Sequence, residues 1–180
     1  MKEDPSGTHE FSRLFPVDKL RDRPVHESIE ATEEECEALS RRLNLVALKN
    51  FEADLDLQRE HSGDVVQVSG NFRAGIVQTC VVTLEPFETD VSESFKAYFA
   101  RPAPAPEGPD LPVEDERAPE PIPASGEIDL GELAAQHLSL ALDPYPRKPG
   151  AVFKPPPGIK AEGEKPNPFA VLADFRGKKK

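Results

Sequence analysis

The chain has 180 residues, of which 37% are hydrophobic and 20 are proline, and it carries a formal net charge of −11 at pH 7. This composition predicts one folded domain that is smaller than the chain. The acidic charge argues against a general nucleic-acid binder, because an acidic surface repels phosphates. Two cysteines do not make a disulfide scaffold. The lack of a long apolar run or a signal peptide predicts a soluble cytoplasmic protein.

The charge is distributed unevenly along the chain. From Pro144 to the end there are nine Lys and Arg against three Asp and Glu, a net charge of +6. The first 143 residues carry 13 basic and 30 acidic groups, a net charge of −17, and the two parts sum to −11. The sequence therefore predicts an acidic body followed by a basic tail.

The first third of the chain predicts two strands and a helix. Residues 11–20 are expected to form a strand that Pro16 restricts to an edge or a bulge, and residues 25–29 alternate as a second short strand. Thr32 and Glu35 have the spacing of a capping box, which predicts a helix over residues 32–44. Cys36 is expected on the buried face of that helix.

Between residues 45 and 99 the hydrophobic period changes to two. Strands are predicted over residues 51–59, 65–72, 74–84 and 87–99, with a turn at residues 61–64 and a bulge or bend at Gly70-Asn71 or Gly75. Asp54 and Asp56 are two apart in a strand, so they are expected on its solvent face. Neighbouring strands in this order favour an antiparallel meander.

The segment from residue 100 to 125 has a different composition, with eight prolines and six acids in 26 residues. Such a stretch buries too little apolar surface to offset the conformational entropy that is lost on folding, so residues 102–117 are predicted to be a disordered acidic loop. The chain is expected to re-enter the fold near Ile122. A helix is then predicted over residues 129–142, capped by Asp129 and Glu132 in a second capping box. Pro144 and Pro146 prevent the helix from continuing.

No catalytic or metal-binding motif is evident. The four histidines have no metal-ligand spacing with each other or with cysteine, and the chain has neither a phosphate-binding glycine loop nor a nucleophile elbow. His137 is interpreted as a hydrogen-bonded packing residue. Cys80 is placed inside a strand, and with Thr83 it lacks the thiolate pair that zinc needs. We therefore expect no enzyme activity, no metal and no cofactor.

Three cationic residues are the candidate contacts for a partner or for RNA: Arg147, Lys148 and Arg73. The two prolines before Arg147 stiffen the backbone, so its direction and that of Lys148 are better fixed than in a loose tail. The alternative for this pair is a purely electrostatic role at the negative end of the helix. Arg73 is expected at a turn, and Lys178 to Lys180 are expected to be solvated.

Two stretches resemble a known family. They are residues 128–151, IDLGELAAQHLSLALDPYPRKPGA, and residues 80–99, CVVTLEPFETDVSESFKAYF. With residues 11–20, FSRLFPVDKL, they resemble the YceD family, also called DUF177. The resemblance implies a role in the accumulation of large-subunit (23S) ribosomal RNA and in large ribosomal subunit assembly. Many members of that family have two cysteines where this chain has Cys80 and Thr83, which argues against a shared metal or redox role here.

Together these observations predict an α+β fold, an antiparallel β-sheet meander packed with two main helices and interrupted by a Pro-rich acidic disordered loop. The expected organisation is a disordered N-terminus (1–10), a YceD-like domain (11–151, with the loop at 100–121), and a basic Pro-rich tail (152–180) with a short apolar segment at 167–175.

Two functions follow as hypotheses. In the first, a non-catalytic bacterial factor contacts the large-subunit precursor, the 23S rRNA or a basic ribosomal protein that its acidic body escorts, without binding DNA or membranes. In the second, an adaptor unrelated to ribosomes docks a partner through residues 167–175.

Overall fold

The structure is a computed structural model of the whole chain and describes residues 9–21, 23–60, 65–101 and 119–153. The main sheet has five strands in the order β2-β3-β4-β5-β6, and a second sheet pairs β1 with β7. The strands are β1 (Leu14–Pro16), β2 (Val25–Glu30), β3 (Ala47–Arg59), β4 (Val65–Thr79), β5 (Pro86–Ala100), β6 (Glu120–Pro121) and β7 (Glu127–Asp129). The helices are η1 (Val17–Lys19), α1 (Glu33–Arg42) and α2 (Leu130–Ala141).

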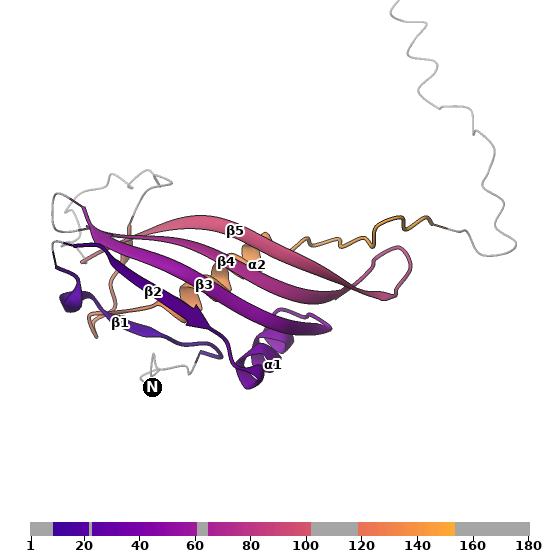
Figure 1. Cartoon of the computed structure of the whole chain (residues 1–180), viewed down its shortest axis with the longest axis horizontal. Helices are drawn as coiled ribbons and strands as arrows, with labels where there is room; N and C mark the ends of the chain where they lie inside the picture. Colours follow the sequence, from indigo (N-terminus) through magenta and orange to yellow (C-terminus); the bar gives the residue numbers. More distant parts are fainter. Residues whose placement is uncertain (1–8, 22, 61–64, 102–118, 154–180) are drawn as a thin grey trace, which may run out of the picture.

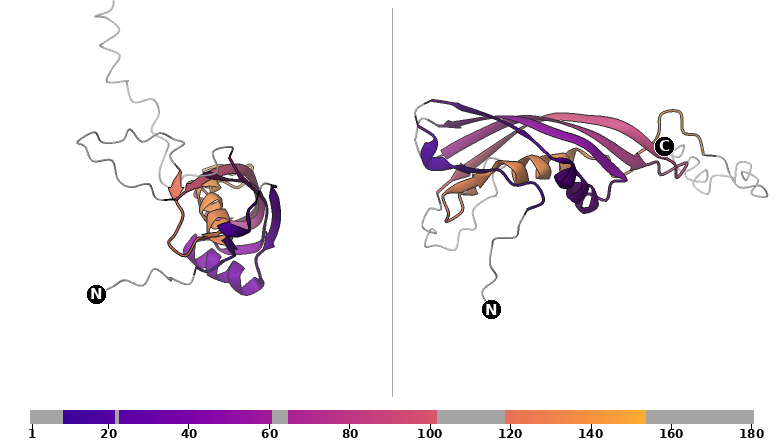
Figure 2. Two further views of the ribbon diagram at one scale, coloured as in Figure 1. Left: turned by 90° about the vertical axis from the view of Figure 1, so that its left-hand side faces the viewer. Right: turned by 60° about the horizontal axis from the view of Figure 1, so that its bottom comes forward.

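The predicted α+β class and the meander are confirmed. Strands β2 to β5 pair in sequence order and antiparallel, whereas β6 pairs with the end of β5 in parallel. The main sheet is long and curved, and it wraps around α2, while α1 lies to one side of the same concave face (Figures 1 and 2). The opposite, convex face is covered by no other described element.

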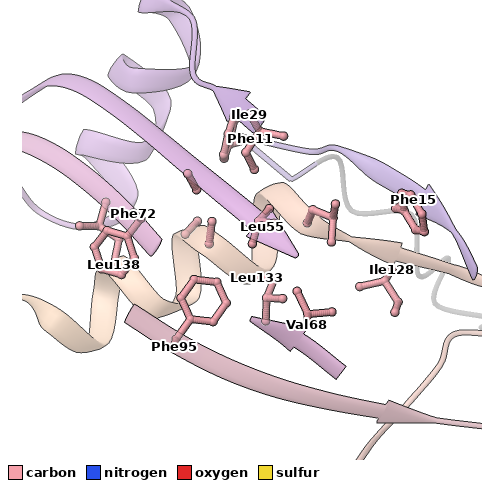
Figure 3. Packing of buried hydrophobic residues seen from close by; sticks show 14 of the residues in the cluster. Phe11, Phe15, Ile29, Leu55, Val68, Phe72, Phe95, Ile128, Leu133 and Leu138 are labelled. Atoms are coloured by element: carbon pink, nitrogen blue, oxygen red, sulfur yellow. The ribbon is translucent and has the colours of Figure 1, made fainter. Parts of the chain in front are cut away.

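The core lies between the concave face of the sheet and α2 (Figure 3). Along β3 the burial alternates, because successive side chains of a strand point to opposite faces. The rings of Phe11, Phe51 and Phe72 form an edge-to-face chain, with centroids 5.4 Å and 6.1 Å apart. Leu138 on α2 is fully buried on the same side. Burial of these large apolar side chains holds the helix to the sheet.

Strand β4 corrects one prediction. Residues 65–72 and 74–84 were expected to form two strands with a bulge or bend at Gly70-Asn71 or Gly75, but residues 65–79 form one strand with unbroken register to β5. The register is shifted only on the β3 side, between Leu48 and Asn50, where Asn50 lies opposite Gly75. Gly70 serves a close approach instead, because a Cβ at this position would lie 2.6 Å from the Phe95 ring and 2.7 Å from Leu55. The glycine thus marks tight packing rather than a bend.

The N-terminal segment is also less regular than predicted. Of residues 11–20, only Leu14–Pro16 form a strand, and a 3₁₀ turn, Val17–Lys19, follows. The partner of this strand is β7, which the sequence pattern did not reveal, and not the meander. Phe11 and Leu20 at the two ends of the segment are nonetheless almost completely buried, so burial rather than regular pairing explains the apolar pattern.

The two helix starts differ in their caps. The predicted capping box at Thr32 and Glu35 is present in both directions. Asp129 does cap α2, since its carboxylate accepts from the N–H groups of Gly131 and Glu132. The Glu132 side chain does not reach back, because it forms a bidentate ion pair with Arg42 at 2.6 Å and 2.7 Å. The second half of that predicted capping box is therefore wrong, and Glu132 joins α2 to the end of α1 instead.

The predicted packing roles of two side chains can be compared with the structure. Cys36 is buried on α1, as expected. His137 is half-buried and stacks on Phe95 of β5, with ring centroids 3.9 Å apart and an interplanar angle of 16°. Burial lowers its pKa, which favours the neutral ring. The ring therefore acts in packing through an aromatic contact.

Several predictions fall outside the described residues. They are the disorder expected for most of residues 1–10 and for residues 102–117, the turn expected at 61–64, the apolar segment at 167–175 and the lysines at 178–180. The expected re-entry of the chain near Ile122 is seen, since Ile122 is buried and its N–H donates to the carbonyl of Ala100 at 2.8 Å. The proposed domain boundaries stay predictions.

Candidate functional site

The candidate site is the exit segment, residues 143–150, which follows α2. The helix ends because Pro144 and Pro146 cannot continue it. The carboxylate of Asp143 accepts from the N–H of Tyr145 at 2.8 Å and starts a local turn. Leu142, at the helix end, is already in an extended conformation. The chain therefore leaves α2 in a direction fixed by the two prolines and this turn.

The exit segment is docked on the β4–β5 turn, residues 80–85. The N–H of Val81 donates to the carbonyl of Pro146 at 2.9 Å, and the N–H of Lys148 donates to the sulfur of Cys80 at 3.3 Å. The ammonium group of Lys148 forms an ion pair with Glu85 at 3.0 Å. These contacts hold the exit segment against the end of the sheet, on the right in Figure 1.

Cys80 is the central acceptor of this contact. The sequence pattern placed Cys80 inside a strand, but the residue lies directly after the end of β4. It is completely buried. Its sulfur also accepts from the N–H of Val82 at 3.4 Å. Hydrogen bonds from the Thr83 side chain, and then from the backbone of Lys148 and of the turn, lower the pKa of Cys80 to about 7. The turn thus stabilises a thiolate, which is a better acceptor than a thiol.

The three predicted contact residues are not brought together. Arg147 is exposed and, within the described part of the chain, is in no ion pair. Lys148 is next to it but is held by Glu85. Arg73 lies in the middle of β4 and not at a turn, about 23 Å along the strand from Cys80. It is exposed and pairs with Glu52 at 3.5 Å. Arg147 is thus the candidate most available to a partner.

Exposed apolar and aromatic side chains occur on the exit segment and on the turn that it contacts. Tyr145 is 71% exposed, and the exposed Val81 and Leu84 lie on the β4–β5 turn. An open groove of about 640 Å³ adjoins them, lined by the ends of both helices, including Arg42, Asn44, Val46 and Pro144. Sequence reasoning missed Tyr145, although an aromatic residue two positions from an arginine and between two prolines was visible in the sequence.

The closest approach to a catalytic arrangement lies elsewhere, on the convex face. The Nδ1 atom of His26 is 2.9 Å from Asp56, and its Nε2 atom is 3.5 Å from the hydroxyl of Ser28. That hydroxyl donates to Asp54 instead, at 2.5 Å. The hydrogen bond to Asp56 raises the pKa of His26, which favours the charged ring over a general base. All four side chains are exposed, and Asp54 and Asp56 are on the solvent face as predicted.

No group of three or more His, Cys, Asp or Glu side chains that could hold a metal ion occurs among residues 9–21, 23–60, 65–101 and 119–153. In the same residues, no helix is long and apolar enough to cross a membrane. The geometry at the end of α2 is that of a contact surface. It offers one exposed cation, Arg147, and one exposed aromatic ring, Tyr145, on a backbone held by hydrogen bonds to the β4–β5 turn.

Comparison with known proteins identifies the family. A family model described as large ribosomal RNA subunit accumulation protein YceD matches residues 68–176, which is more than half of the chain. The protein therefore belongs to the YceD family, as the sequence resemblance implied. The match includes most of β4, and all of β5, α2 and the exit segment. No curated protein and no solved structure matches the chain.

Proposed function

We propose that this protein is a non-catalytic factor that supports the accumulation of 23S ribosomal RNA and the assembly of the large ribosomal subunit, in the cytoplasm. The family description supports the connection to large-subunit RNA. One observation supports a direct contact: Arg147 is exposed on a segment that is fixed at both ends, by Pro146 to Val81 and by Lys148 to Cys80. Because the backbone here is already held, binding phosphate would have to order the Arg147 side chain but not the chain around it.

The surroundings of Arg147 favour unpaired RNA. Arginine binds phosphate through charge-assisted hydrogen bonds, and an exposed tyrosine ring offers a face on which an unstacked base can lie. Tyr145 and Arg147 provide both groups within three residues. A duplex groove would require a broad basic surface, whereas the first 143 residues have a net charge of −17 from 13 basic and 30 acidic groups.

The acidic body has a separate role in this proposal, the escort of a basic ribosomal protein. Exposed carboxylates on β3 and β5, including Asp54, Asp56 and Asp90, outnumber the exposed cations Lys49, Arg73 and Lys96 on β3, β4 and β5. Such a surface attracts a basic polypeptide and repels RNA. The protein thus contacts a basic protein with its body and RNA with its exit segment.

Sucrose-gradient sedimentation of cell extracts tests the assembly role. We expect the protein to travel with large-subunit precursors, and a protein that stays at the top of the gradient would contradict the proposal. Pull-down at rising salt tests the two contacts separately. Recovery of ribosomal RNA without any ribosomal protein would remove the escort role and leave the RNA contact.

The substitution Arg147→Ala tests the RNA contact itself. Removing one phosphate contact should reduce the slope of log binding constant against log salt by about one. Arg23→Ala is the matched control, because Arg23 is also exposed but precedes β2 at the other end of the sheet. Equal slopes for both variants would show that RNA does not bind at the exit segment.

A further inference from the structure

One open edge among the described residues is the outer edge of β5, the upper strand of the sheet in Figure 1. Strand β5 runs from Pro86 to Ala100 and pairs along its whole length with β4 on one side. On the other side, among the described residues, only Phe99 and Ala100 have a strand partner, β6. Residues 86–98 therefore present an edge without a described neighbouring strand.

The register determines which backbone groups face this edge. The carbonyl of Ala100 accepts from Ile122 on the β6 side, so the backbone groups of Ala100 point away from β4. The residue opposite Ala100 on β4 is Val65, whose carbonyl accepts from the N–H of Glu60 on the β3 side. Val65 and Ala100 therefore point away from each other, as the contact with Ile122 also indicates. Backbone direction alternates along an antiparallel strand. The residues whose N–H and C=O groups face the open edge are thus Glu88, Asp90, Ser92, Ser94 and Lys96.

Proteins usually protect such an edge by a bulge, a proline, a short strand or charged side chains. This edge is long, its register with β4 is unbroken, and no proline occurs between Phe87 and Ala100. Charge is the device present: Glu88, which pairs with Lys49, and Asp90 are acidic on the convex side, and Glu93 is acidic on the concave side. Two copies of this edge would repel each other, whereas a basic strand would be attracted.

The concave side of the edge is incompletely covered. Phe87 and Val91 point to this side and are only half-buried. His137 of α2 stacks on Phe95, and Leu140, three residues further along the same side of the helix, is 81% exposed. An added strand with apolar side chains on its concave side would cover these residues. Its opposite side chains would lie beside Glu88 and Asp90 on the convex face.

We propose that the edge of β5 binds an extended segment of a basic polypeptide by strand addition, with cationic and apolar residues alternating in that segment. This inference rests on the proposed escort of a basic ribosomal protein and specifies its surface. Backbone hydrogen bonds supply the affinity and the alternation of side chains supplies the selectivity, as in other complexes formed by strand addition.

The test uses the full chain and a ten-residue peptide of alternating lysine and valine with blocked ends. Binding is followed by fluorescence anisotropy, and amide exchange is followed by NMR. We expect the peptide to bind and to slow exchange at Asp90, Ser92 and Ser94. Two control peptides have the same sequence, but one is N-methylated at its odd-numbered amides and the other at its even-numbered amides. One of the two should bind at least tenfold more weakly, although its charge is unchanged.

The matched variants are Ser92→Pro and Ser92→Ala. Proline at this position removes an N–H that faces the open edge and not one that bonds to β4, so the sheet should fold with little change in melting temperature. We expect Ser92→Pro to weaken peptide binding at least tenfold and Ser92→Ala to bind like the wild type. Glu93→Pro, which removes a bond to β4, should instead lower the melting temperature.

Several results would overturn the proposal. Equal binding of all three peptides would show that charge alone attracts them. Slow exchange at Ser92 and Ser94 in the free protein, relieved by deleting residues 154–180 or 102–118, would show that the chain covers its own edge. A dimer in sedimentation equilibrium that Ser92→Pro abolishes would show that a second copy does so. If these results appear while the protein still sediments with large-subunit precursors, only the strand-addition site fails and the proposed function stands.

Discussion

At the scale of single residues, Cys80 links two parts of the chain that are far apart in sequence. Its sulfur accepts from Val82 in its own turn and from Lys148 in the exit segment. The lowered pKa of about 7 follows from these donors and from Thr83. This cysteine is therefore an anchor for the backbone beside Arg147, a role that its sequence position after a β-rich stretch did not reveal.

We predict that Cys80→Ala loosens the exit segment. The N–H groups of Val82 and Lys148 lose their acceptor, so the amide of Lys148 should exchange at least tenfold faster in NMR. Cys36→Ala is the control, because that cysteine is buried on α1 and packs without holding the segment. Unchanged exchange at Lys148 in the Cys80 variant would show that Pro146 and Glu85 suffice to fix the segment.

The residue scale also shows what the sequence conveys about the candidate site. The cationic pair Arg147 and Lys148 was visible from composition and from the prolines before it. The different roles of these two residues could not be predicted, because Lys148 is held by Glu85, which lies 63 residues away in the sequence. Arg73 was expected at a turn because two glycines flank its position, but β4 continues through it and pairs Arg73 with Ser92 of β5.

At the scale of elements, α1 is held to the N-terminal segment by Arg13. Its guanidinium donates to both carboxylate oxygens of Glu35, at 2.7 Å and 2.9 Å, and to the carbonyl of Glu30. The hydrogen bond to Arg13 is the main reason that the pKa of Glu35 falls to about 2. One carboxylate thus completes the cap of α1 and ties it to the start of the chain.

We predict a pH-dependent stabilisation from this carboxylate. Because the pKa of Glu35 is lowered on folding, its contribution is present above about pH 4.5 and is lost as the pH falls towards 2. Glu35→Gln should reduce the free energy of unfolding by about 1–2 kcal/mol at pH 7, since the pair is partly screened by solvent. The difference from the wild type should be much smaller near pH 2.5.

Urea denaturation at pH 7 and near pH 2.5 measures this difference. Glu37→Gln is the control, since Glu37 is exposed on the same helix and its replacement should change stability by less than about 0.5 kcal/mol at either pH. A difference between Glu35→Gln and the wild type that stays constant with pH would assign the effect to packing and not to ionisation.

Elements with local signals were predicted better than elements without them. The cap at Thr32, the period-two pattern of β3 and the stop at Pro144 are encoded within a few residues, and all three are found near their predicted positions. The continuity of β4 and the shortness of β1 depend on distant partners. The second half of the predicted capping box at Asp129 failed for the same reason, because Arg42 binds the Glu132 carboxylate more favourably than the backbone can.

At the scale of the whole molecule, deletion of the tail distinguishes the two function hypotheses, because only the adaptor hypothesis places the binding site in the tail. Deleting residues 154–180 removes the basic tail and the apolar segment at 167–175 but keeps α2, Arg147 and the edge of β5. We predict that the shortened protein still associates with large-subunit precursors in a sucrose gradient. Loss of all partner binding on this deletion would favour the adaptor hypothesis over the assembly hypothesis.

The fold class followed from the order of periodicities, a helix between strands and then a run of strands before a second helix. The second, two-stranded sheet did not, because β1 and β7 are short and pair Leu14 with Asp129 across most of the folded chain. The open edge of β5 was equally invisible in the sequence. A strand pattern shows which side chains face the core, but not which backbone groups lack a neighbour.

The pairing of β1 with β7 has a consequence for synthesis of the protein. Phe15 sits opposite Ile128, and the fully enclosed Phe11 touches the first turn of α2, where a methyl group on Gly131 would lie 2.5 Å from the Phe11 carbonyl oxygen. While the nascent polypeptide is shorter than about 130 residues, Phe11 can contact Phe51 of β3, but the part of its site that β7 and α2 supply is still missing. The molecule therefore closes late, after the meander has already been translated, and its earliest residues are among the last to be enclosed.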